Sequence, residues 1–275
     1  MYENYWHLAA NPFDNDCPSS YFFDSQTHQA ALLKLRYLIE NRKGLGLLVG
    51  ATGSGKSFLT GVLAEELAET QGPFVPLVFP QLSPAELLAY LAVELGANET
   101  AVDSRVVGLD RTLREIERLL SGFAKQGRHP VIVVDEAHLI DDPEVFQSLR
   151  LLLNFHQSDQ RHFSLLLSGQ PELRSHVRRL GALEERLTIK CVLRSLSLDE
   201  TADYVRFRLQ AAGGPAGLFD DAALLAVFEL SGGVPRRINR LCDLALLVGF
   251  ADESSCVSAA QVEAVADELT AVAVD

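Results

Sequence analysis

Residues 50–57 read Gly50-Ala51-Thr52-Gly53-Ser54-Gly55-Lys56-Ser57. This stretch matches the phosphate-binding loop known as Walker A: Gly, any four residues, Gly, Lys, then Ser or Thr. A strand-like apolar run at 45–49 precedes it, and a segment of helical periodicity at 59–68 follows it. The glycines let backbone N–H groups turn towards phosphate oxygens, and the following helix presents its positive N-terminus to them. The motif therefore predicts a nucleotide-binding α/β fold.

A second acidic motif lies further along, at Val131-Ile132-Val133-Val134-Asp135-Glu136. Its four aliphatic residues predict a buried strand, and the two acids then lie at the carboxyl end, where open α/β sheets bind ligands. Because a phosphate loop precedes it, we interpret the motif as Walker B rather than as an ordinary strand that ends in solvated acids. Asp135 is predicted to hold Mg²⁺, and Glu136 is predicted to orient and polarise the attacking water.

The two motifs together predict ATP and Mg²⁺ as cofactors and ATP hydrolysis as the reaction. Lys56 would contact the β- and γ-phosphates, and the Ser57 hydroxyl would join Asp135 in ligating Mg²⁺. The predicted nucleotide-binding residues are Gly50, Ala51, Thr52, Gly53, Ser54, Gly55, Lys56, Ser57, Phe58 and Asp135. Residues 135–138 also spell a helicase box, but a helicase of that class needs a second motor domain. We interpret His138 as a solvent-facing or packing residue.

The remaining pattern indicates a mostly parallel sheet with crossover helices, followed by helices alone. Strands are predicted at 45–49, 74–79, 131–134, 163–167 and 189–193, and helices at 59–68, 84–95 (with Ser83 as N-cap) and 109–123. After about residue 195 only helical patterns occur, at 198–209, 221–230, 235–248 and 258–269. The predicted fold class is α/β: a P-loop NTPase core over residues 1–194 and an all-helical lid over residues 195–275.

Two arginine-bearing segments complete the candidate site. Arg186 lies just before the last predicted strand, and Arg236 opens a helix of the predicted lid. An arginine before the final strand can reach the γ-phosphate of a neighbouring subunit, whereas one at the start of the lid helix can reach it within the same subunit. Both arginines are therefore predicted to contribute to catalysis.

Several further motifs give the chain a family resemblance. They are Tyr5 to Phe13, Tyr21-Phe22-Phe23, His28 to Ile39, Gln81 to Leu88, Asp135-Glu136-Ala137-His138, Ser168 to Leu173 and Gly233 to Asn239. With the Walker motifs, they resemble the AAA+ ATPases of the general secretion pathway protein A (ExeA/GspA) group, which is related to TniB and TnsC transposition ATPases. The resemblance covers nearly the whole chain and implies an AAA+ fold.

The resemblance also implies roles for single residues. Gln170 resembles the polar sensor-1 position, with Ser168 as the other candidate. Arg186 resembles the arginine finger and Arg236 the sensor-2 arginine. Asn11-Pro12-Phe13 either packs near the adenine or covers the edge of the core as a hydrophobic strap. Such proteins act as ring or filament homo-oligomers with ATP sites between subunits, so the resemblance implies a homo-oligomer, a protein partner and a role in secretion.

Composition limits the other functions open to this 275-residue chain. It has 24 Lys and Arg against 37 Asp and Glu, a net charge of −13. A protein that coats nucleic acid through bulk charge is therefore not expected, although acids gathered in 58–104 and 241–275 leave the rest near neutral. The sequence shows no signal peptide or transmembrane segment, and its four cysteines form no metal or disulfide pattern. A cytoplasmic protein is predicted.

Three functions remain to be weighed. The first is an oligomeric ATPase that assembles or remodels a protein partner in secretion, pilus or export systems. The second is an ATP-dependent DNA-binding regulator of the transposition type, suggested by a basic cluster of Arg174, Arg178, Arg179, Arg186, Lys190, Arg194, Arg236, Arg237 and Arg240. The third, a scaffold that binds ATP without turnover, is disfavoured by Glu136. ExeA-type proteins continue into a transmembrane helix and a peptidoglycan-binding domain, whereas this sequence stops at Asp275.

Overall fold

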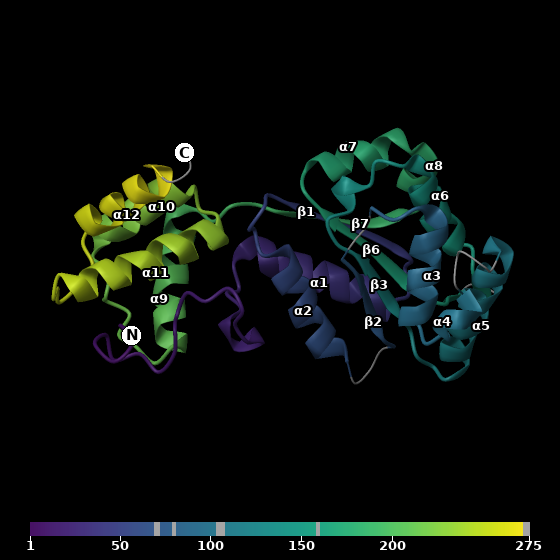
Figure 1. Cartoon of the computed structure of the whole chain (residues 1–275), viewed down its shortest axis with the longest axis horizontal. Coiled ribbons are helices and arrows are strands. Elements are labelled where there is room, and N and C mark those ends of the chain that lie inside the picture. The colour runs from purple at the N-terminus through teal and green to yellow at the C-terminus, as the bar shows by residue number, and fades with distance from the viewer. Residues whose placement is uncertain (69–71, 79–80, 103–107, 158–159, 272–275) are drawn as a thin grey trace. The chain divides into compact units, whose positions relative to one another are not determined.

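The computed structural model describes residues 1–68, 72–78, 81–102, 108–157 and 160–271 (Figure 1). The chain forms two compact units. A sheet unit contains Gln29–Gly50 and Leu59–Leu193, and a helical unit contains Met1–His28, Ala51–Phe58 and Arg194–Asp275. The phosphate loop, Ala51–Phe58, is thus grouped with the helices although it directly follows the first strand.

The sheet unit is built on five parallel strands in the order β2-β3-β6-β1-β7. They are β1 (Leu45–Gly50), β2 (Phe74–Leu77), β3 (Val131–Val134), β6 (Ser164–Gly169) and β7 (Leu187–Leu193). All five predicted strands are therefore confirmed within two residues at the described ends, while the predicted terminus Phe79 lies outside the described residues. Every residue of β1, β3 and β6 is buried, which explains their unbroken aliphatic sequences.

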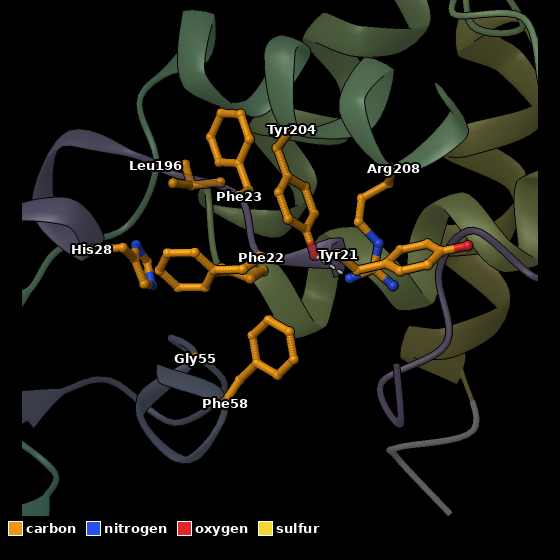
Figure 2. A pocket seen from close by; sticks show the side chains of 10 residues that line it. Tyr21, Phe22, Phe23, His28, Gly55, Phe58, Leu196, Tyr204 and Arg208 are labelled. Carbon is orange, nitrogen blue, oxygen red and sulfur yellow. Dashed lines mark hydrogen bonds between the residues drawn. The ribbon is translucent and has the colours of Figure 1, made fainter. Parts of the chain in front are cut away.

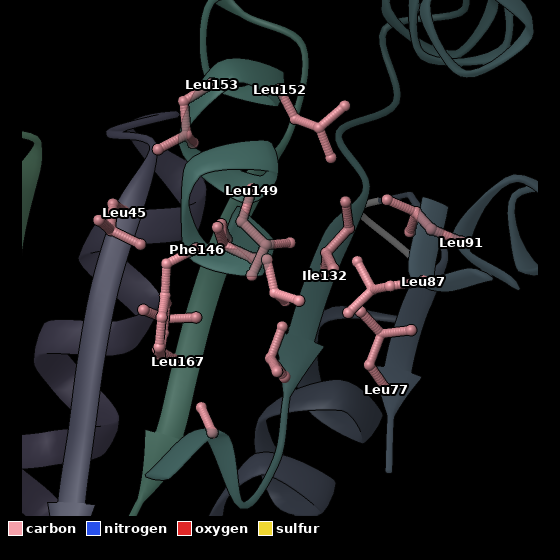
Figure 3. Close-up of a cluster of buried hydrophobic side chains, with 14 of the residues drawn as sticks. Leu45, Leu77, Leu87, Leu91, Ile132, Phe146, Leu149, Leu152, Leu153 and Leu167 are labelled. Carbon is pink, nitrogen blue, oxygen red and sulfur yellow. The ribbon is translucent and has the colours of Figure 1, made fainter. Parts of the chain in front are cut away.

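The connections of the sheet unit are mostly helical, as crossovers between parallel strands require. They are α1 (Gln26–Glu40), α2 (Lys56–Leu67), α3 (Pro84–Glu94), α4 (Glu99–Val102), α5 (Leu109–Lys125), η2 (Ala137–Leu139), α6 (Pro143–Leu152), α7 (Glu172–Arg179) and α8 (Gly181–Glu184), with two short antiparallel strands, β4 (His156–Gln157) and β5 (Gln160–Arg161). The predicted N-cap is confirmed, because Ser83 and Glu86 form a capping box at α3. Figure 3 shows side chains of α3 and α6 packed against the strands in the core.

The helical unit contains η1 (Ser19–Tyr21), α9 (Leu198–Ala211), α10 (Asp221–Ser231), α11 (Pro235–Ala251) and α12 (Ala259–Ala271). The N-terminal segment shares their hydrophobic core: the Trp6 indole N–H donates to the carbonyl of Leu246 at 3.0 Å, and the Phe13 ring meets Phe219 edge to face. This grouping differs from the predicted division at residue 194, which placed residues 1–28 with the sheet. The reason is the burial of Tyr2, Trp6, Leu8 and Phe13 among these helices.

Candidate nucleotide-binding site

The Walker B acids lie at the carboxyl edge of the sheet, beside the end of β6. Because β3 and β6 run parallel with Val134 opposite Leu167, the next residues along, Asp135 and Ser168, are neighbours. The Ser168 hydroxyl donates to Asp135 Oδ1 at 2.9 Å, and the Glu136 backbone N–H donates to the same oxygen at 2.9 Å. These two donors fix the carboxylate of Asp135. β1 also ends at this edge, at Gly50, since β1 and β3 are parallel members of one sheet.

Glu136 has an unusual backbone conformation. Its φ is 47°, in the left-handed region that residues other than glycine rarely adopt. The turn redirects the chain from the end of β3 into η2, and the Glu136 side chain stays 40% exposed. Strained backbone of this kind gathers at functional sites, where the surrounding structure holds it in place. The conformation therefore agrees with the predicted role of Glu136 in contacting a water molecule.

His138 lies beside the Walker B acids in the sheet unit. Of the two alternatives in the sequence interpretation, solvent-facing or packing, the structure agrees with packing: the side chain is 11% exposed and has a polar neighbour at each ring nitrogen. Nδ1 lies 3.1 Å from Glu136 Oε2, and Nε2 lies 2.9 Å from the side-chain nitrogen of Gln170. The available signal was the histidine two residues after Glu136, but spacing alone does not reveal that η2 folds the ring back towards β6.

In the helical unit, the phosphate loop depends on its glycines. Gly53 and Gly55 have φ of 78° and 89°, and a Cβ at Gly53 would lie 2.6 Å from Arg236 Cβ. The Arg236 backbone N–H donates to the Gly53 carbonyl at 3.2 Å. Lys56 is 5% exposed, and its ammonium group donates to the Ala51 carbonyl at 3.2 Å. The structure thus brings the predicted sensor-2 position, Arg236, against the predicted phosphate loop.

His28 contacts the same loop at the Ser54 carbonyl. Its Nε2 lies 2.9 Å from the Ser54 carbonyl oxygen, and its Nδ1 lies 2.7 Å from the Ser25 hydroxyl. A carbonyl can only accept, so Nε2 carries the proton and Nδ1 accepts from the hydroxyl. Burial lowers the pKa of His28 below its ordinary value, which favours this neutral form. His28 therefore fixes the Ser54 peptide with its carbonyl turned away from the face that would bind phosphate.

A small, mostly aromatic cavity of about 50 Å³ adjoins the phosphate loop within the helical unit. Its lining residues, shown in Figure 2, are Tyr21, Phe22, Phe23, His28, Gly55, Phe58, Leu196, Tyr204, Arg208 and Pro235. The Phe22 ring lies between His28 and Phe58, with centroid separations of 6.2 and 6.1 Å. The predicted binding residue Phe58 forms part of this lining.

Arg208 holds the N-terminal segment at this cavity. It is 2% exposed, and its guanidinium donates to the carbonyls of Pro12 and Asp14, each at 2.6 Å. The same group lies 5.0 Å from the centre of the Tyr21 ring. Of the two interpretations of Asn11-Pro12-Phe13, the structure supports the hydrophobic strap, while residues 21–23 line the cavity.

Arg186 lies at the amino ends of the parallel strands, opposite to the carboxyl ends that carry Asp135 and Glu136. It directly precedes β7, whose first residue, Leu187, pairs with Leu45 at the start of β1. The Arg186 guanidinium donates to Asn154 Oδ1 at 2.9 Å on the surface of the sheet unit. β1 ends five residues after Leu45, at Gly50, so the length of the strand, about 16 Å at 3.3 Å per residue, separates the two edges. The structure thus does not bring Arg186 together with Asp135 and Glu136.

Comparison with known proteins identifies the family of this chain. A family described as "AAA domain" matches residues 39–177, which is half of the chain. The chain is a member of the AAA domain family. The resemblance expected from its motifs is also confirmed: this AAA domain protein is 34% identical over 277 residues to General secretion pathway protein A of Aeromonas hydrophila. The match covers 99% of this chain but 49% of that protein, so the chain spans about half the length of this relative.

Solved structures show the same fold. The Aeropyrum pernix ORC2 protein in its ADPNP and ADP complexes matches with a TM-score of 0.72 and 15% identity, covering 94% of this chain and 71% of that one. The Thermotoga maritima RuvB Holliday junction branch migration motor matches with a TM-score of 0.59 and 20% identity, covering 88% and 69%. At these identities the likeness supports the α/β AAA+ fold with a helical region, and nothing finer. Within the described part of the chain, no helix is both long and apolar enough to cross a membrane.

Proposed function

We propose that this AAA domain protein is an ATPase that binds ATP with Mg²⁺ and hydrolyses it. The observation that carries the proposal is the ordered acidic edge of the sheet, where Ser168 fixes Asp135 and a left-handed turn presents Glu136. Hydrolysis requires a second acidic residue after Asp135, and nucleotide binding alone does not. Glu136 would act as the base that orients and polarises the attacking water.

The residues of the phosphate loop fit a bound triphosphate. Gly53 and Gly55 adopt left-handed backbone, which directs N–H groups into the loop, and no Cβ fills the cradle. Lys56 and Ser57 of the loop and Asp135 of the sheet unit are the residue types that a Mg²⁺–triphosphate requires: an ammonium group for the phosphates, and a hydroxyl and a carboxylate for the metal. When bound, Mg²⁺ would neutralise charge that develops on the phosphate oxygens. Arg236 would contribute a further positive charge from the start of α11.

The aromatic side chains beside the loop would contact the adenine base. Replacing Phe22 by alanine removes a ring that lies between His28 and Phe58. We expect the Kd for ATP to rise roughly 5- to 10-fold, because one aromatic contact contributes about 1 kcal/mol. Isothermal titration should show this weakening for Mg-ATP and no change for pyrophosphate, which has no base.

Leu225→Ala, which trims a side chain 43% exposed on α10, serves as the control and should leave both affinities unchanged. Equal weakening of ATP and pyrophosphate binding in Phe22→Ala would contradict a base-binding role for this cavity. Failure of the wild-type protein to bind Mg-ATP at all would contradict the proposed ATPase function.

We further infer that the ATP site is completed by a neighbouring copy of the chain. Arg186 lies at the amino edge of the sheet, a strand length from the edge that carries Asp135. It therefore cannot serve the ATP bound at the opposite edge of its own sheet, but a second subunit in a ring or filament could present it there. Arg186 would then act as an arginine finger in trans, while Gln170 at the end of β6 would sense the γ-phosphate.

A role in secretion is supported by the relative that matches nearly all of this chain, which is described as a general secretion pathway protein. In that role we propose that the chain acts as a cytoplasmic homo-oligomer that assembles or remodels a protein partner. The alternative, an ATP-dependent DNA-binding regulator, is favoured by one observation: α7 exposes Arg174, Arg178 and Arg179 within two turns. Of the two, we favour the protein partner because 34% identity carries more information about role than an exposed basic helix.

A mobility-shift experiment separates these two roles. If the DNA role is correct, duplex DNA should be retarded in the presence of ATP, and retardation should weaken steeply as salt rises because phosphate contacts release counterions. We expect no ATP-dependent shift at about 50 mM salt. A shift that is lost in the triple variant Arg174→Ala, Arg178→Ala, Arg179→Ala would contradict our preference.

A further inference from the structure

A buried series of hydrogen bonds joins the start of α1 to the phosphate loop. The Ser25 hydroxyl lies 2.7 Å from His28 Nδ1, and His28 Nε2 lies 2.9 Å from the Ser54 carbonyl oxygen. All three residues are buried, and all belong to the helical unit. The Walker motifs include neither Ser25 nor His28, and the match to the AAA domain family begins at residue 39. No role is therefore assigned to either residue.

With a neutral ring, the protons in this series can be arranged in one way only. The Ser54 carbonyl accepts, so Nε2 must carry the ring proton, and Nδ1 must then accept from the Ser25 hydroxyl. The Ser25 oxygen in turn accepts from the His28 backbone N–H at 3.5 Å, which keeps the hydroxyl beside the ring. Burial lowers the pKa of His28 by more than the nearby charges of Asp24 and Glu200 raise it, which favours the neutral ring.

The carbonyl of Ser54 and the N–H of Gly55 belong to one peptide group. In a trans peptide these two bonds point in opposite directions, and the described residues contain no cis peptide. Because His28 holds the Ser54 carbonyl on its own side, the Gly55 N–H points to the other side, into the loop. Reversal of this peptide would place an acceptor, the carbonyl oxygen, where negative phosphates need a donor.

Gly55 allows this peptide to turn over unless another group holds it. Its φ is 89°, and glycine adopts positive and negative φ about equally well. The contact itself requires the glycine, since a Cβ at this position would lie 3.1 Å from His28 Nε2. The residue that lets the imidazole approach is thus little restrained by its own backbone. A fixed donor to the Ser54 carbonyl is therefore needed to hold one orientation.

We propose that His28 is a positioning residue that fixes the Ser54–Gly55 peptide with its N–H towards the phosphates before the nucleotide binds. Ser25 orients the ring for this contact. The inference rests on the proposed binding of ATP, but it concerns the backbone of the loop and not the chemistry at Glu136. His28 also lies in the aromatic lining beside Phe22, so its loss must be distinguished from the loss of a contact with the base.

Three variants of His28 separate its hydrogen bond from its bulk. His28→Ala removes the donor, and we expect the Kd to rise roughly 10-fold both for Mg-ATP and for pyrophosphate, as for a lost buried hydrogen bond. A glutamine places its amide nitrogen near the position of Nε2, so His28→Gln should recover most of the affinity for both ligands. Asparagine reaches only the position of Nδ1, so His28→Asn should bind both as weakly as His28→Ala. Isothermal titration measures all of these affinities.

The matched control is His7→Asn, the same replacement at an exposed histidine whose φ of 56° asparagine tolerates. It should bind both ligands with wild-type affinity. Wild-type affinity in His28→Ala would overturn the proposal, and so would weakening for Mg-ATP alone, the pattern expected of a base contact such as Phe22. If His28→Ala does not fold, the comparison of His28→Gln with His28→Asn decides, and equal affinities of these two variants would overturn the proposal.

A second measurement needs no nucleotide. Nitrogen-15 spectra of the histidine rings, recorded on the nucleotide-free protein at neutral pH, distinguish protonated from unprotonated ring nitrogens. The resonances that vanish in His28→Gln belong to His28. They should show a neutral ring with its proton on Nε2. A ring protonated on Nδ1 alone, or on both nitrogens, would overturn the proposal.

These measurements distinguish failure of the inference from failure of the proposed function. If wild type binds Mg-ATP and pyrophosphate, and His28→Ala binds both equally well, the ATP site stands and the role of His28 is wrong. If wild type binds Mg-ATP but no pyrophosphate, the free loop is not arranged for phosphate, and again only the inference is wrong. If wild type binds neither ligand, the proposed function is wrong and the positioning role is wrong with it.

Discussion

Replacing Glu136 by glutamine should lower kcat for ATP hydrolysis by roughly 10²- to 10⁴-fold, the usual contribution of a positioned general base. The amide keeps the shape of the side chain but cannot accept a proton from water. Because the substitution leaves the phosphate loop intact, Mg-ATP should bind with a Kd close to that of wild type. Steady-state hydrolysis together with equilibrium titration measures both quantities on the same protein.

The matched control is Asp141→Asn, which neutralises an exposed acid five residues further along the same segment. It should change neither kcat nor Kd. Lys56→Ala should behave in the opposite way to Glu136→Gln, because removal of the phosphate-contacting ammonium group weakens binding itself. Hydrolysis that persists in Glu136→Gln would show that another group activates water and would contradict the proposed chemistry.

Arg186→Ala should lower kcat by about 10³-fold, at the lower end of the effect of an arginine finger. The loss should be partly reversed by mixing this variant with Glu136→Gln. In such mixtures a Glu136→Gln subunit donates an intact Arg186 to a neighbour whose own Glu136 is intact, so some interfaces regain both groups. Hydrolysis measured across the mixing ratio should rise above the sum of the two variants and peak between them.

Arg178→Ala provides the control, because it removes an exposed arginine of α7 that lies outside the proposed site. Its mixtures with Glu136→Gln should follow simple dilution. If Arg186→Ala mixtures follow dilution as well, although both variants bind ATP and associate, Arg186 does not act across a subunit interface. Normal activity of Arg186→Ala alone would remove it from the catalytic groups.

The sheet was largely predictable from the sequence because its strands are buried on both faces. Burial of this kind requires unbroken aliphatic runs, and β3 begins and ends at the residues expected. β6 was predicted two residues short, because Ser168 and Gly169 are not typical strand residues. That difference matters to the site, since the extra length is what places Ser168 beside Asp135.

Long-range packing accounts for what could not be predicted. Trp6 and Phe13 identify a hydrophobic segment, but nothing in the sequence indicates that their partners are Leu246 and Phe219, more than 200 residues away. His138 is a similar case at short range. Its distance from Glu136 along the chain was plain, whereas its contact with Gln170 depends on the register between β3 and β6. Local patterns specify elements, and contacts across elements depend on the tertiary fold.

The left-handed turn at Glu136 lowers the stability of the fold at a residue with a proposed catalytic role. A non-glycine residue in this conformation costs about 1–2 kcal/mol of folding free energy, and glycine would avoid most of that cost. A protein selected for robustness alone would therefore have glycine or asparagine after Asp135. The acid that the proposed chemistry requires is therefore present at a cost in folding free energy.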